Sequence, residues 1–154
     1  MDKINSIEIV QVGIVTKDIK RTAQNYAALF GLPMPNINQV PPYEQSKAVY
    51  RGKPMMSRAQ ICSFKMGAVQ LEIVQPDDED SIWKELLETK GEGAQFIGFM
   101  LEDPEGTAEF LKEKGIEPLH WGDLANGQAI YIMMDSMDKL GLALNIKGRK
   151  LVKS

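Results

Sequence analysis

The sequence has few of the residues that build disulfide frameworks and transition-metal sites. Its 154 residues include one cysteine, Cys62, and one histidine, His120. One cysteine cannot close an internal disulfide, and one thiol with one imidazole cannot form a zinc cage. These counts argue against a disulfide-rich secreted scaffold and a zinc module, and they favour a reducing, cytoplasmic setting.

Long apolar runs and a field of positive charge are also lacking. No apolar stretch approaches the roughly 20 residues that cross a membrane, and residues 1–6 contain no apolar signal segment. The formal net charge is -3, with basic residues scattered along the chain. We therefore expect neither a membrane nor a nucleic-acid partner.

What is present is the composition of an ordinary globular protein. Apolar residues make up 44% and charged residues 25% of the chain. A chain of this length can bury a real core, and it suits one domain or two small fused modules.

The chain repeats itself at an offset of 85 residues. A strand-like stretch at 7–14 is followed by a helical pattern that starts near Ile19 and ends at Gly31. A second strand-like stretch at 96–101 is followed by a helical pattern that ends at Gly115. The offset aligns these pairs: Gln11 with Phe96, Gly13 with Gly98, Asp18 with Asp103, Thr22 with Thr107 and Ala23 with Ala108. Such self-similarity predicts a structural repeat.

Further strand patterns complete each half as βαβββ. They lie at 58–65 and 69–73 in the first half, and at 128–134 and 142–146 in the second. We predict a single domain over 1–154, with module one at about 6–76, a connecting helix at about 81–90 and module two at about 91–148. The segment 32–53 contains four prolines, which suits either a lid over a binding site or a mobile surface loop.

Alternation along the strands predicts which side chains face inward. The more apolar face of each strand should meet the helices, which leaves the other face for a shared interior. By this parity Gln11, Glu72, Phe96 and Asn145 occupy equivalent inward positions.

Five segments resemble the glyoxalase, bleomycin-resistance and dioxygenase superfamily, also called vicinal oxygen chelate proteins. These segments are 11–19, 69–76, 91–99, 131–135 and 140–146, and they span nearly the whole chain. The likeness is greatest to the methylmalonyl-coenzyme A epimerase and lactoylglutathione lyase branches. The resemblance implies an α+β fold in which two tandem βαβββ modules form a cup-shaped mixed β-sheet with helices outside.

The same resemblance implies a divalent metal at four inward positions, which here hold Gln11, Glu72, Phe96 and Asn145. Only Glu72 is a strong ligand. Gln11 and Asn145 offer at most carbonyl oxygens, and Phe96 has no donor atom. We therefore predict no metal ligands and no metal cofactor.

Glu72 is the candidate catalytic residue. A carboxylate in a partly apolar cup has a raised pKa and suits proton transfer. The alternative is a carboxylate neutralised by a cation such as Arg58. The predicted ligand-binding residues are Gln11, Phe96, Asn145, Gln70, Gln95 and Met133.

Three other residues have structural interpretations. His120 is expected in a loop, without the partners that a metal or nucleophilic site needs. Cys62 is expected to be buried and unreactive, and Trp83 to serve helix packing.

Two functions remain open at this level. One is an epimerase, isomerase or lyase that acts on a small acyl thioester or thiol adduct, with Glu72 moving a proton. The other is a metal-free protein that binds or sequesters a small apolar molecule, as antibiotic-binding relatives do. Exposed strand edges, and the pairing of such edges in relatives, predict a homodimer.

Overall fold

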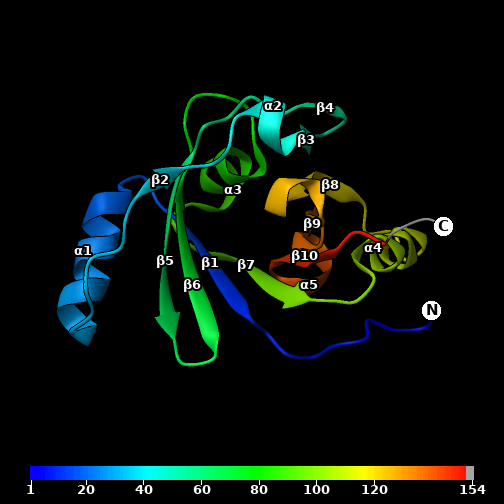
Figure 1. Cartoon of the computed structure of the whole chain (residues 1–154), viewed down its shortest axis with the longest axis horizontal. Helices are drawn as coiled ribbons and strands as arrows, with labels where there is room; N and C mark the ends of the chain where they lie inside the picture. The colour runs from blue at the N-terminus through cyan, green and yellow to red at the C-terminus, as the bar shows by residue number, and fades with distance from the viewer. Residues whose placement is uncertain (152–154) are drawn as a thin grey trace.

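The computed structural model describes residues 1–151. All of its described strands belong to one curved sheet, in the order β2-β5-β6-β1-β7-β10-β9-β8-β3-β4 (Figure 1). Helices pack outside this sheet, so the predicted α+β class and cup-shaped arrangement are confirmed.

The first module contains the elements expected of one βαβββ unit. These are β1 (Gln11–Val15), α1 (Ile19–Phe30), β2 (Asn38–Gln39), β5 (Gln60–Met66) and β6 (Val69–Gln75). Strand β2 is only two residues long, because the proline-rich sequence around it cannot continue a ladder. It pairs with the start of β5.

The second module repeats this order after the connecting helix α3 (Ile82–Lys90). Its elements are β7 (Gly93–Met100), α4 (Pro104–Glu113), β8 (Pro118–Leu124), β9 (Ala129–Met134) and β10 (Ala143–Arg149). A 3-10 turn, η1 (Ala125–Gly127), and a short helix, α5 (Met137–Leu140), connect its last three strands.

The two long helices begin in the same way at an offset of 85 residues. Asp18 accepts a hydrogen bond from Arg21 N at the start of α1, and Asp103 accepts one from Gly106 N at the start of α4. These side chains satisfy backbone donors that have no partner in the first turn. Thr22 and Thr107 each donate to the carbonyl oxygen of their capping aspartate.

The modules join within the chain through β1 and β7, which pair antiparallel. Helix α1 packs on Val12 and Ile14 of β1, and helix α4 packs on Leu144 and Ile146 of β10. The predicted parity is therefore correct: these residues face the helices, and the alternate residues face the interior. Buried Cys62 lies in the α1 layer, and burial raises the pKa of its thiol, as expected of a structural cysteine.

The segment 32–53 is more ordered than a mobile loop. It contains β2, the short helix α2 (Tyr43–Ser46) and strand β3 (Val49–Tyr50), and β3 forms a hairpin with β4 (Lys53–Pro54). Strand β3 pairs with β8 of the other module. The segment thus runs from one end of the sheet to the other and crosses the mouth of the cup (Figure 1).

Strand β8 corrects the expectation for residues 120–123. They were expected in a loop after the helix of the second module. In the structure they form part of β8, which pairs with both β9 and β3. None of the helices in the described part of the chain is long and apolar enough to cross a membrane.

Candidate functional site

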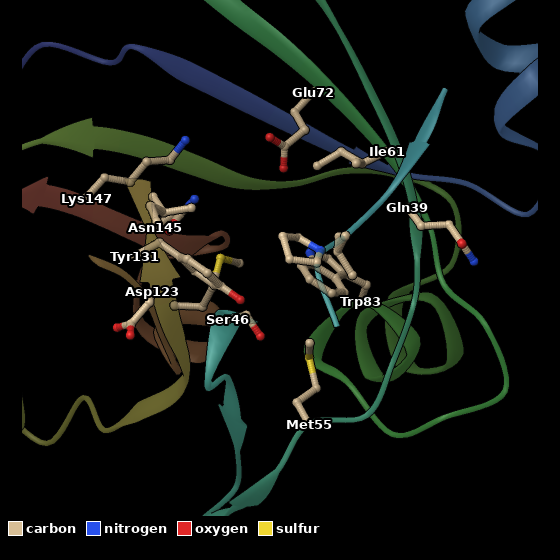
Figure 2. Close-up of a pocket in the computed structure, with 14 residues that line it drawn as sticks. Gln39, Ser46, Met55, Ile61, Glu72, Trp83, Asp123, Tyr131, Asn145 and Lys147 are labelled. Atoms are coloured by element: carbon tan, nitrogen blue, oxygen red, sulfur yellow. The ribbon is translucent and has the colours of Figure 1, made fainter. Parts of the chain in front are cut away.

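The interior face of the sheet borders a cavity of about 160 Å³. Its walls are mainly apolar and come from both modules, from helix α3 and from the segment 32–53 that crosses the mouth of the cup (Figure 2). Among the lining residues are Val40, Met55, Ile61, Glu72, Trp83, Tyr131, Met133, Asn145 and Lys147. A small concave site with few polar groups is the usual form of a small-molecule site.

Three of the four predicted inward residues form one hydrogen-bonded chain. Asn145 Nδ2 donates to Gln11 Oε1 at 2.9 Å, and Gln11 Nε2 donates to Glu72 Oε2 at 2.8 Å. Gln11 is fully buried and Asn145 nearly so, which makes these bonds costly to break. This hydrogen-bonded chain leaves Glu72 Oε1 without a hydrogen-bond partner among the described residues.

Two glycines permit this arrangement, and they are related by the repeat. A Cβ added at Gly98 would lie 2.6 Å from Gln11 Oε1, so glycine there lets Gln11 pass over β7 toward Asn145. A Cβ at Gly13 would lie 2.0 Å from Phe96 Cζ, so glycine there leaves room for the buried Phe96 ring. Each module thus accommodates the inward residue of the other, which brings the four predicted positions together in one interior.

Burial raises the pKa of Glu72, and the charge of Lys147 opposes this rise. Figure 2 shows the Lys147 side chain extending toward the side of the cavity that holds the Glu72 carboxylate. The cation expected near Glu72 was Arg58, but its Nε donates to Val40 O and its backbone N donates to Asp77 Oδ2. The cation whose charge acts on Glu72 is therefore Lys147 and not Arg58.

The residues at the four positions do not fit a divalent metal. Gln11 uses both amide atoms in the hydrogen-bonded chain, and Phe96 has no lone pair to donate. No group of three His, Cys, Asp or Glu side chains among residues 1–151 is arranged to hold a metal ion. Glu72 and Asn145 alone lack the donors that such ions require.

His120 lies inside the protein. It is fully buried, packs edge-on against Trp83 and Tyr131, and its Nε2 lies 2.9 Å from Tyr131 Oη. Burial lowers the pKa of His120 to about 3, so the imidazole is neutral. Burial also raises the pKa of Tyr131. The pair is a neutral hydrogen-bonded support of the cavity wall.

The remaining predicted ligand-binding residues divide into two groups. Met133 lines the cavity, as expected. Gln70 donates to Ser63 Oγ on the exposed end of the sheet, and Gln95 donates to Gly91 O. Gln70 and Gln95 lie outside the cavity, and the fully buried Gln11 and Phe96 do not line it either, which corrects the expectation for these four residues. Gln70 is too far along its strand, and Gln95 has no cross-strand partner because the pairing of β1 with β7 shifts register there.

Among the cavity-wall residues that sequence reasoning missed are Trp83, Tyr131 and Lys147. Trp83 was assigned to helix packing, but it reaches the cavity from α3. Tyr131 and Lys147 were not considered, although parity could have found them. Tyr131 precedes Met133 by two residues, and Lys147 follows Asn145 by two residues, so each shares its neighbour's face.

The fold and the cavity define a two-module cup protein with a cavity between its modules. The chain belongs to the Glyoxalase/Bleomycin resistance protein/Dioxygenase superfamily, whose family model matches residues 10–132. No curated protein matches the chain.

Several solved structures share the fold. A hypothetical protein from Bacillus halodurans is 18% identical, with a TM-score of 0.62 and coverage of 96% of this chain and 97% of the other. A variant methylmalonyl-CoA epimerase from Streptomyces coelicolor in complex with 2-nitronate-propionyl-CoA is 22% identical, with a TM-score of 0.61 and coverage of 96% and 97%. Methylmalonyl-CoA epimerase from Mycobacterium tuberculosis is 15% identical, with a TM-score of 0.64 and coverage of 98% and 93%.

Proposed function

We propose that this protein is an epimerase, isomerase or lyase of small acyl compounds in which Glu72 moves a proton without a divalent metal. The observation that carries the proposal is the Glu72 carboxylate, which Gln11 holds at the wall of an apolar cavity. A raised pKa brings a carboxylate closer to the pH at which it works best as a base.

The substrate class follows from the size of the cavity and from structural neighbours. A volume of about 160 Å³ accommodates a small acyl group, while a larger thiol carrier would extend through the mouth. Two similar structures contain acyl-coenzyme A ligands, namely 2-nitronate-propionyl-CoA and methylmalonyl-CoA. We therefore propose an acyl thioester with an acidic hydrogen next to its carbonyl group.

Proton exchange tests this proposal directly. The protein is incubated in deuterium oxide with methylmalonyl-CoA and other branched acyl thioesters, and proton NMR follows loss of the signal next to the carbonyl. Glu72→Gln should slow the exchange by about 100-fold or more, which is the usual contribution of a positioned base. Glu109→Gln makes the same change on an exposed position of α4 and should have no effect.

A second function is favoured by the largely apolar wall and by Phe96, which fills one of the four inward positions. In this alternative the protein binds a small apolar molecule without converting it. Native mass spectrometry would then detect a ligand retained from the cell, and the exchange assay would show no activity above the protein-free rate. Exchange that Glu72→Gln leaves unchanged would reject Glu72 as the base.

A further inference from the structure

The side chain of Lys147 lies at the cavity wall, while its backbone pairs in the sheet. It lies on β10 two residues after Asn145 and therefore on the same interior face. Its Cα is the cross-strand partner of Tyr131, another cavity residue. Figure 2 shows its ammonium end directed toward the part of the cavity beside Glu72.

The other charged groups of this region already have partners. Asp123, which also lines the cavity, pairs with Lys150 at 2.5 Å, and Arg51 pairs with Glu85 at 2.5 Å. Within residues 1–151, no carboxylate oxygen lies within 4.0 Å of Lys147 Nζ. Lys147 is also the one cation among the cavity's described lining residues.

A cation in an apolar wall needs an anionic partner, because desolvation disfavours an isolated charge. Burial does lower the pKa of Lys147, while the charge of Glu72 raises it. The two groups therefore interact electrostatically without a direct ion pair. Both side chains line the same cavity, so a ligand bound there can contact both.

We propose that Lys147 binds the anionic oxygen of an enolate-type ligand in this cavity and is a catalytic residue. The assignment rests on the proposed function. Glu72 takes the proton from the carbon next to the carbonyl group, and the electron pair of that bond moves toward the carbonyl carbon. That pair forms a carbon–carbon double bond, and the π pair of the carbonyl group moves onto its oxygen. The negative charge therefore develops on this oxygen, to which the Lys147 ammonium donates a hydrogen bond. Return of the proton to either face of the carbon regenerates both groups.

In this role Lys147 is the electrophile that the residues at the four inward positions do not provide. Proton abstraction next to a carbonyl needs an electrophile that stabilises the developing oxyanion. Gln11 and Asn145 are already engaged with each other and with Glu72. The Lys147 ammonium therefore provides positive charge where the donor set does not support a metal ion.

Comparing the affinities for an anionic and a neutral probe tests the proposal and does not require the protein to catalyse a reaction. The probe is 4-nitrophenolate, whose charged oxygen on a flat apolar ring imitates an enolate, and the neutral comparison is its methyl ether, 4-nitroanisole. Absorbance and calorimetric titrations at a pH above the pKa of the probe give both affinities. Wild-type protein should prefer the phenolate by about tenfold or more, as expected of a hydrogen bond to a charged group.

Matched variants assign the preference to Lys147. Lys147→Met should abolish the preference for phenolate while binding 4-nitroanisole as before, and Lys147→Arg should restore it. Lys65→Met changes an exposed lysine of β5 and should behave as wild type. Equal affinities of the wild type for the two probes, failure to bind either, or a preference that survives Lys147→Met would each overturn the proposal.

Glu72→Gln separates this proposal from that of Glu72 as a base. The variant should lose proton exchange but keep its preference for 4-nitrophenolate, because Lys147 remains in place and a repelling carboxylate is removed. An anion preference in a protein that exchanges no protons would therefore support the Lys147 subsite and reject the proposed reaction.

Discussion

At the level of single residues, two glycines determine how the side chains of the interior pack. Gly13 and Gly98 leave space for Phe96 and Gln11, and the resulting contacts connect Gln11 to both Glu72 and Asn145. A substitution at either glycine would place a methyl group inside an existing side chain. The identity of the four inward residues thus depends on two positions that carry no side chain.

The first residue-scale prediction concerns metal content. Dialysed protein should retain far less than one equivalent of zinc, nickel, cobalt or manganese by elemental analysis, because Phe96 has no lone pair and Gln11 is already engaged. Even loss of residues that only orient ligands weakens metal binding by about 10 to 100-fold. About one equivalent that Glu72→Ala releases would contradict the prediction.

The converse experiment introduces donors at the same positions. The triple change Gln11→His, Phe96→His and Asn145→Glu should create measurable metal affinity, since the structure places these positions around one interior. Calorimetric titration with zinc measures it, and Glu72→Ala in the triple variant should weaken it. No gain of affinity would mean that the backbone no longer supports such a site.

A second residue-scale prediction concerns acid stability. The pKa of His120 falls from an ordinary value of 6.5 to about 3 on folding, so between these values the unfolded chain binds a proton that the folded chain does not. The free energy of unfolding should therefore decrease as the pH falls through this window. The slope from this group is at most about 1.4 kcal/mol per pH unit.

Urea denaturation at a series of pH values, with His120→Phe beside wild type, isolates this contribution. The variant keeps an aromatic ring beside Trp83 and Tyr131 but cannot take up a proton, so its stability should depend less on pH. The comparison is needed because Glu72, with a raised pKa, acts in the opposite sense above its ordinary value. Equal pH slopes for the two proteins would argue against a buried neutral histidine.

At the scale of elements, the segment over the mouth of the cup decides access to the cavity. Val40 and Met55 anchor it in the core, and β3 pairs with β8 at its far end. The Arg51–Glu85 ion pair also holds this segment to α3, but partly exposed pairs contribute little. Opening of this segment is therefore the natural route for a ligand to enter.

Hydrogen exchange tests this route. Amides of residues 43–55 should exchange more slowly when the cavity is filled, because opening then requires release of the ligand. At a 4-nitrophenolate concentration about 100 times its Kd, the exchange rate should fall by up to about 100-fold. Amides of the outer helix α4 serve as the internal control and should not change. Equal protection with and without the probe would mean that the ligand enters elsewhere.

At the scale of the whole molecule, the sheet is open at its ends. Strand β2 covers only Gln60 and Ile61 of β5, which leaves the rest of that strand as an edge. Leu29 and Phe30 of α1 are also exposed. Unpaired edges and apolar side chains of this kind favour association with another copy.

We therefore predict a symmetric dimer. Size-exclusion chromatography with light scattering should give about twice the mass of the chain, with dissociation on dilution if the contact is weak. A monomer at all accessible concentrations would remove this prediction without affecting the fold.

Local patterns in the sequence were enough to predict the repeat, the helices and the faces of the strands. Helix caps, helical spacing and alternation are local, so Asp18, Asp103 and the inward parity of Gln11, Glu72, Phe96 and Asn145 could be predicted. The tertiary structure alone decided the crossing of β3 to β8, the burial of His120 and the contribution of Trp83 and Lys147 to one cavity. These features depend on contacts between residues far apart in the chain, which local patterns do not record.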